Sequence, residues 1–166
     1  ILGTSDIHGL VDWQYDVASG GHRPVTLVFA KEKSKAGIKE ALFDKRTVVF
    51  FRNLLIGRES YLIPLIDACV EPSEADYLTT WAGNSTVARV LIENKGDAPF
   101  ILNSRSAYTF HESGDIIVLE ANATTAVKVK TIDALEEFQL KFEVLNAITA
   151  PGTHPEIVLN IKVRQE

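Results

Sequence analysis

FQLKFEV, residues 138–144, is the stretch that decides the fold of the second half of the chain. Apolar and polar residues alternate through it, which is the two-residue period of a β-strand with one buried and one solvated face. Residues 157–163 repeat this pattern, and shorter strand-like runs precede both, back to residue 87. Short strands at intervals of roughly 8–12 residues are typical of a small antiparallel sandwich. The sequence therefore predicts an antiparallel β-sandwich over residues 75–166.

The first part of the chain, up to residue 74, alternates strand and helix patterns. Residues 25–30 and 47–51 are continuous runs of β-branched and aromatic residues, as expected of buried strands. Between them, Ser34 is placed to cap a helix that runs to Asp44. The apolar stripe of this helix is expected at Ile38, Ala41 and Leu42. A strand, a helix and a strand joined by short links predict a βαβ-like arrangement.

A second helix is expected from Ser60, with Pro64 in its first turn, where a missing N–H costs little. The helix pattern ends at Pro72, where the composition changes. We therefore expect an α/β domain over residues 1–74 and an all-β domain over residues 75–166.

Composition excludes some classes of protein. The formal net charge is −5, from 17 Lys and Arg against 22 Asp and Glu, which argues against a surface that tracks nucleic acid. No apolar run approaches the roughly 20 residues that span a bilayer, so a soluble protein is expected. The single cysteine, Cys69, lies in an apolar run and is interpreted as a small buried side chain. The chain starts with Ile1 and contains no methionine, so we expect it to be the C-terminal part of a longer polypeptide.

Asp6 and His8 form the most informative polar pair. Residues 1–5 have the small and apolar texture of a strand. Residues two apart on a strand share a face, so a carboxylate and an imidazole would point together and suit a divalent transition metal. The alternative is a capping Asp and a surface His beside the turn residue Gly9. A catalytic metal needs at least three protein ligands, so the pair is an incomplete site.

Two further residues are candidates for phosphate binding. Arg23 could grip a phosphate oxygen in bidentate fashion and His22 could assist it. The alternative is that both simply end a loop before Pro24 fixes the approach to the next strand.

Residues 3–8, Gly-Thr-Ser-Asp-Ile-His, resemble the last metal-ligand motif of the PHP (polymerase and histidinol phosphatase) family of phosphoesterases. The segments at residues 23–34, 38–42, 46–49 and 55–59 resemble the end of a bacterial, exported phosphodiesterase branch of that family. The resemblance covers roughly residues 1–70, and the rest resembles an immunoglobulin-like appendage. It implies that residues 1–74 are the C-terminal end of a (β/α)7 barrel in a periplasmic or exported parent protein.

The resemblance also implies an activity. Relatives hydrolyse phosphoesters with a metal-bound hydroxide, using zinc, manganese or iron, so Asp6 and His8 would be metal ligands. The family's other ligand motifs are absent from this sequence, so the remainder of the barrel N-terminal to Ile1 would be the partner of this chain. The substrate would be a small phosphoester, and the chain by itself is expected to be inactive.

Two rival interpretations stay open. A calcineurin-like phosphoesterase also begins with Asp-x-His-Gly after an apolar strand, but it should contain an Asn-His pair, which this sequence lacks. The other rival is a non-catalytic binding or structural module, in which the sandwich makes the useful contacts.

Overall fold

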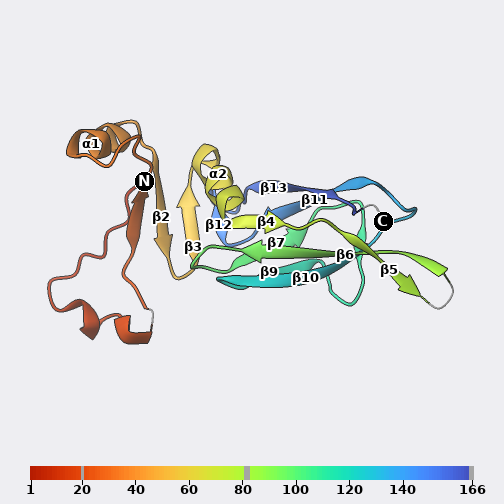
Figure 1. The fold of residues 1–166 in the computed structure, drawn as a ribbon. Helices are drawn as coiled ribbons and strands as arrows, with labels where there is room; N and C mark the ends of the chain where they lie inside the picture. The colour runs from red at the N-terminus through yellow and green to blue at the C-terminus, as the bar shows by residue number, and fades with distance from the viewer. Residues whose placement is uncertain (20, 81–82, 165–166) are drawn as a thin grey trace. The chain divides into compact units, whose positions relative to one another are not determined.

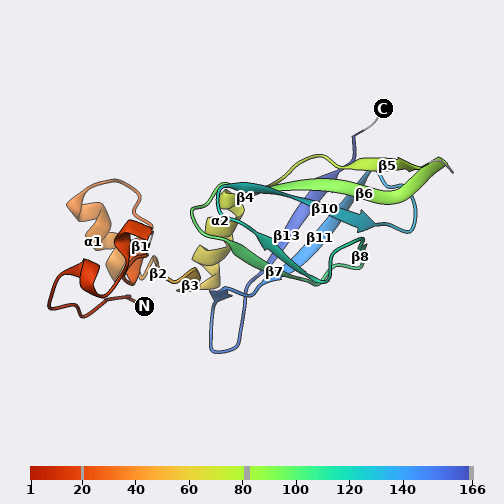
Figure 2. The ribbon, with the colours of Figure 1, turned by 90° about the horizontal axis from the view of Figure 1, so that it is seen from below.

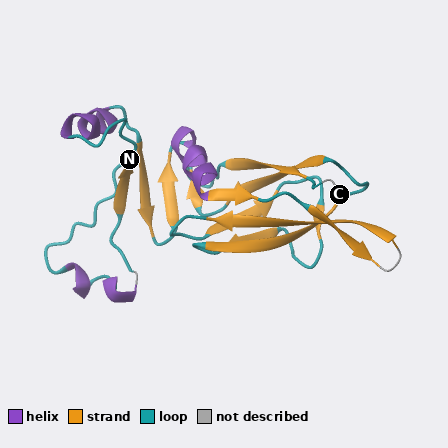
Figure 3. Cartoon of the chain, viewed as in Figure 1, coloured by secondary structure: helices purple, strands orange, loops and turns teal. Residues whose placement is uncertain are grey.

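The computed structural model describes residues 1–19, 21–80 and 83–164. The chain divides into two compact units, the first formed by residues 1–64 and 146–153 and the second by residues 65–145 and 154–166. Within these described ranges, strands make up most of the regular structure, and two α-helices accompany them (Figure 3). The division falls inside the second helix, and a short return of the chain at residues 146–153 adds to the first unit.

The first unit contains a small sheet in the order β1-β2-β3-β12 (Figure 1). Its elements are the 3-10 helices η1 (Val11–Trp13) and η2 (Val17–Ser19), the strands β1 (Val25–Val28), β2 (Thr47–Phe51), β3 (Leu54–Gly57) and β12 (Ala147–Ile148), the helix α1 (Lys35–Phe43) and the start of α2 (Glu59–Cys69). Strands β1, β2 and β3 are antiparallel neighbours, and only β12 pairs in parallel, with Ala147 opposite Leu55.

The predicted βαβ arrangement is wrong. A βαβ crossover joins parallel strands, whereas the chain leaves β1 through α1 and returns along β2 in the opposite direction, with Val25 opposite Phe50. Strand and helix patterns are the same in both topologies, so the sequence did not distinguish them. The strands of a (β/α)7 barrel are parallel, and that barrel is therefore not in this chain.

The local predictions for α1 hold in part. Ser34 is the N-cap, and its Oγ accepts a hydrogen bond from the Gly37 N–H at 2.9 Å. Ala41 is fully buried, but Ile38 and Leu42 are 44% and 40% exposed, so the predicted apolar stripe is largely uncovered. Pro64 lies at the sixth residue of α2 rather than in its first turn.

The second unit is the predicted antiparallel sandwich (Figure 2). Its strands are β4 (Val70–Pro72), β5 (Asp76–Thr80), β6 (Gly83–Asn94), β7 (Phe100–Ser104), β8 (Thr109–Phe110), β9 (Ile116–Leu119), β10 (Ala123–Lys130), β11 (Glu137–Val144) and β13 (Glu156–Lys162). One sheet has the order β4-β6-β10-β8, with β5 also paired to β6, and the other has the order β13-β11-β7-β9.

Alternation along the strands builds the core of this sandwich. In β11, Phe138, Leu140 and Phe142 are buried while Gln139 and Lys141 are exposed. In β13, Ile157, Leu159 and Ile161 are buried in the same way. Fully burying one such side chain stabilises the fold by about 1.5–3 kcal/mol relative to leaving it exposed. The two strands are neighbours in one sheet, so these runs supply adjacent rows of one layer of the hydrophobic core.

The segment after β4 changes sheets. Glu71 pairs opposite Glu93 of β6, in the first sheet. Four residues later, Ala75 forms a parallel bridge with Val163, at the end of β13 in the second sheet. The Ala75 N–H donates to the Lys162 carbonyl at 2.8 Å, and the Arg164 N–H donates to the Ala75 carbonyl at 2.9 Å. This crossing ties the two sheets together at one end of the β13 edge.

Candidate functional site

The segment that carries Asp6 and His8 is not a strand. Residues 1–8 have no regular secondary structure. The Gly3 N–H donates to Thr26 Oγ1 at 2.9 Å, and the Thr26 hydroxyl donates back to the Gly3 carbonyl at 3.2 Å. One side chain thus takes the backbone groups that a strand ladder would use, and the strand prediction is wrong.

The backbone at Asp6 also departs from an extended conformation. Its φ angle is +49°, in the left-handed region, so the chain turns at this residue. Asp6 and His8 therefore do not share one strand face, because side chains alternate in this way only along extended backbone.

The turn nevertheless suits His8 as a metal ligand. His8 Nδ1 lies 2.9 Å from the Asp6 carbonyl oxygen, which can only accept, so Nδ1 carries the proton. The lone pair is then on Nε2, the arrangement common in ligating histidines. Both residues are exposed. Both side chains are of types that bind metal ions, but two ligands are too few for a site. Among residues 1–19, 21–80 and 83–164, no three His, Cys, Asp or Glu side chains lie close enough together to hold a metal ion.

Arg23 and His22 occupy different surroundings. Arg23 is exposed and lines the same shallow hollow as Asp6, together with Thr26. His22 is half-buried, with its ring stacked on Phe50 at a centroid distance of 4.6 Å. Its Nδ1 donates to the Arg23 carbonyl at 2.8 Å. Asp6 and Arg23 thus share one hollow, which neither His8 nor His22 lines.

Cys69 does not add a reactive group. Burial raises the pKa of its thiol, and the nearby charge of Asp97 raises it further. A thiol with a raised pKa stays protonated at neutral pH, and the protonated form is a poor nucleophile and metal ligand. Cys69 is half-buried, so its interpretation as a small buried side chain holds only in part.

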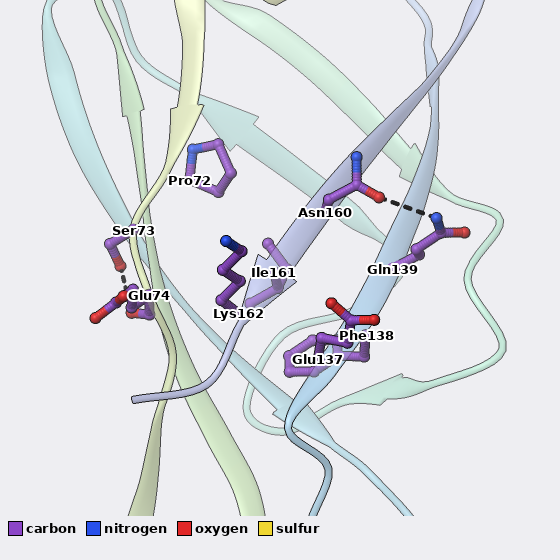
Figure 4. Close-up of a pocket in the computed structure, with 9 residues that line it drawn as sticks. All are labelled: Pro72, Ser73, Glu74, Glu137, Phe138, Gln139, Asn160, Ile161 and Lys162. Carbon is purple, nitrogen blue, oxygen red and sulfur yellow. Dashed lines mark hydrogen bonds between the residues drawn. The ribbon is translucent and has the colours of Figure 1, made fainter. Parts of the chain in front are cut away.

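The sandwich carries a groove that the sequence did not predict (Figure 4). It encloses about 390 Å³ and is lined by Pro72, Ser73, Glu74, Glu137, Phe138, Gln139, Asn160, Ile161 and Lys162. Figure 4 shows Pro72, Ser73 and Glu74 on one side and the strands β11 and β13 on the other. Gln139 Nε2 donates to Asn160 Oδ1 at 2.9 Å across the two strands. The only signal in the sequence was the change of composition at Pro72.

One solved structure compares closely with this chain. It is a crystal structure of a two-domain protein containing a predicted PHP-like metal-dependent phosphoesterase, from Bacteroides vulgatus. It is 31% identical over 96% of this chain, with a TM-score of 0.81. This chain spans only 45% of the length of that structure. No curated protein matches this sequence.

A family model also matches, over residues 73–160, which is more than half of the chain and nearly all of the sandwich. The model describes an Ig-like domain, in agreement with the two antiparallel sheets of the second unit. Among the described residues no helix is both long and apolar enough to cross a membrane. By the match and the fold together, the chain belongs to the DUF5001 family of Ig-like domains.

Proposed function

We propose that this chain is the accessory part of a two-domain, metal-dependent phosphoesterase of the PHP type. The observation that carries the proposal is the match, along 96% of this chain, to the Bacteroides vulgatus protein with its predicted PHP-like phosphoesterase. The catalytic barrel would be formed by residues of the parent protein outside this 166-residue chain, and the Ig-like sandwich would be non-catalytic. A periplasmic or exported location of the parent protein remains part of this proposal.

The uncovered apolar surface of the first unit supports a neighbouring domain. Eight large apolar side chains of this unit are at least 40% exposed: Ile1, Leu2, Leu10, Trp13, Val17, Ile38, Leu42 and Phe43. Its buried apolar residues are fewer: Ala41, Val48, Val49, Leu55, Leu62 and Ala147. A unit with more exposed large apolar side chains than buried apolar residues is expected to pack against a partner. The partner we propose is the barrel domain of the same polypeptide.

Asp6 and His8 are the residues through which the chain would contribute to catalysis. In the assembled protein, the Asp6 carboxylate and the His8 Nε2 would each hold a zinc, manganese or iron ion, with the remaining ligands supplied by the barrel. A bound divalent metal activates water and polarises a phosphoryl oxygen. Arg23 shares the hollow with Asp6 and would bind a phosphate oxygen, while His22 would support the Arg23 backbone.

Turnover of a nitrophenyl phosphodiester by the natural full-length polypeptide tests this function. His8→Ala should lower turnover more than about 100-fold. Loss of a group that hydrogen-bonds to a metal ligand already costs about 10–100-fold in activity, and loss of the ligand itself should cost more. His111→Ala, at an exposed histidine of the sandwich, should leave turnover unchanged. The 166-residue chain alone should be inactive. Equal turnover by the wild type and His8→Ala would contradict the proposal.

A second function, ligand binding by the sandwich, is favoured by the groove between residues 72–74 and strands β11 and β13. It is compatible with the first, since an accessory domain can bind while its neighbour catalyses.

A further inference from the structure

The register of β13 determines which of its backbone groups are free. The Val163 N–H donates to the Glu136 carbonyl at 2.8 Å, and the Val144 N–H donates to the Pro155 carbonyl at 3.0 Å. Hydrogen-bonded and non-hydrogen-bonded pairs alternate in an antiparallel ladder, so these two bonds fix the pattern between them. The backbone groups of Glu156, Val158, Asn160 and Lys162 therefore point away from β11.

This outward edge is covered only at one end. Strand β13 is the last strand of its sheet, and Ala75 bonds the Lys162 carbonyl where the chain changes sheets. In the part of the chain that the structure describes, no backbone hydrogen bond reaches the outward groups of Val158 or Asn160. An open strand edge with a row of donors and acceptors is a template for another strand.

The groove meets this edge at Asn160, beside the end that Ala75 covers, and provides room for side chains. Pro72, Phe138 and Ile161 give it apolar lining, while Asn160 and Lys162 belong to the open strand itself. A strand added at the edge would alternate its side chains, with every second one directed to the apolar lining and the others to the rim.

The rim is acidic. Glu137 lines the groove, and Glu136 and Glu137 together line the hollow that continues from it. Glu74, on the opposite side, already has an ion pair with Arg164 at 3.6 Å. Among the described residues no ion pair joins Glu136 or Glu137 to a cation, although Lys162 lies opposite Glu137 in the strand register. Basic side chains at the outer positions of an added strand would complement these two carboxylates.

We propose that the β13 edge and its groove bind an extended peptide segment in which apolar and basic residues alternate, by strand addition at Val158 and Asn160. Backbone hydrogen bonds to these residues supply affinity, and the apolar lining and acidic rim supply specificity. This inference concerns the sandwich alone and does not depend on the proposed phosphoesterase activity.

A blocked nine-residue peptide in which valine alternates with lysine is the probe. Without it, hydrogen exchange should be fast at the amides of Val158 and Asn160 and slow at those of Leu159 and Ile161. With it, exchange at Val158 and Asn160 should slow. The same peptide with alternate backbone amides methylated, which keeps every side chain but removes donors, should not bind.

Two variants at position 160 distinguish the contribution of the backbone N–H to binding from that of the side chain. Asn160→Pro removes the outward N–H without breaking a bond to β11, so affinity for the probe should fall at least about tenfold. Asn160→Ala loses the same side-chain bond to Gln139 but keeps the N–H, so it should bind within about threefold of the wild type.

Three results would overturn the proposal: no binding of the probe, protection confined to amides outside the outward-facing row of Glu156, Val158, Asn160 and Lys162, or equal binding of the methylated peptide. Dimerisation of the chain through this edge in place of probe binding would assign the edge to a second copy instead. Since the exchange pattern is measured on the wild-type chain, the test stands even if Asn160→Pro fails to fold.

Discussion

Asn94 is the buried polar side chain on which one corner of the sandwich depends. It is fully buried, and its Nδ2 donates to the carbonyls of Ala98, Leu119 and Glu120 at 2.9, 3.1 and 3.0 Å. Its Oδ1 accepts from the Gly96 N–H at 2.9 Å. These contacts hold the turn after β6 against the end of β9.

Asn94→Ala should therefore be strongly destabilising. The side-chain amide has two N–H hydrogens, which its three carbonyl partners share, and its oxygen accepts one further hydrogen bond. The variant therefore removes the equivalent of three hydrogen bonds and leaves backbone groups unpaired. Each unsatisfied buried group costs about 1–3 kcal/mol, which gives roughly 3–5 kcal/mol after partial access of water. This is a large part of the roughly 5–15 kcal/mol by which a domain is stable.

Urea unfolding of the 166-residue chain, followed by far-ultraviolet circular dichroism, measures this loss as a shift of midpoint at constant slope. Gln139→Ala is the matched control, because Gln139 is exposed and has one hydrogen bond, to Asn160. It should lower the free energy of unfolding by less than about 1 kcal/mol. An effect of Asn94→Ala as small as that of the control would refute the reasoning.

Two further predictions concern the caps and charges. Ser34→Ala removes the acceptor of the Gly37 N–H and should lower the free energy of unfolding by about 1 kcal/mol. Ser34→Asp keeps an acceptor at this position and should restore most of that loss. An unchanged free energy of unfolding in urea for Ser34→Ala would show that the cap contributes nothing. Hydrogen bonds from Asn103 and Arg105 lower the pKa of Glu143, so its contribution to stability is present above its ordinary pKa and is lost as pH falls through the lowered value. The stability of wild type relative to Glu143→Gln should thus decline as pH drops below about 4, and parallel pH profiles of the two proteins would contradict this.

Predictions from the local order of apolar and polar residues were correct where the pattern of burial matches the repeat of the helix or strand. The alternation at residues 138–144 and 157–163 correctly predicted strands with one buried face, because a two-residue period is set by the backbone of the strand itself. Ser34 was correctly predicted as a cap for the same reason, since its hydroxyl acts only three residues along the chain.

Predictions that needed distant partners failed or were missed. Strand patterns carry no direction, so the antiparallel pairing of β1 with β2 was not foreseen. Asp6 and His8 were placed on a strand, but the Thr26 hydroxyl holds Gly3 and the chain turns at Asp6. The groove joins residues near positions 73, 138 and 161, which come together only in the folded sandwich.

The metal content of the natural full-length polypeptide tests the central claim most directly. If Asp6 and His8 complete a metal centre, the purified wild type should hold stoichiometric zinc, manganese or iron, and Asp6→Ala should lose at least one ion per chain. Asp12→Ala, at another exposed carboxylate nearby in sequence, should retain the full complement. Equal metal content in the wild type and Asp6→Ala would contradict the account.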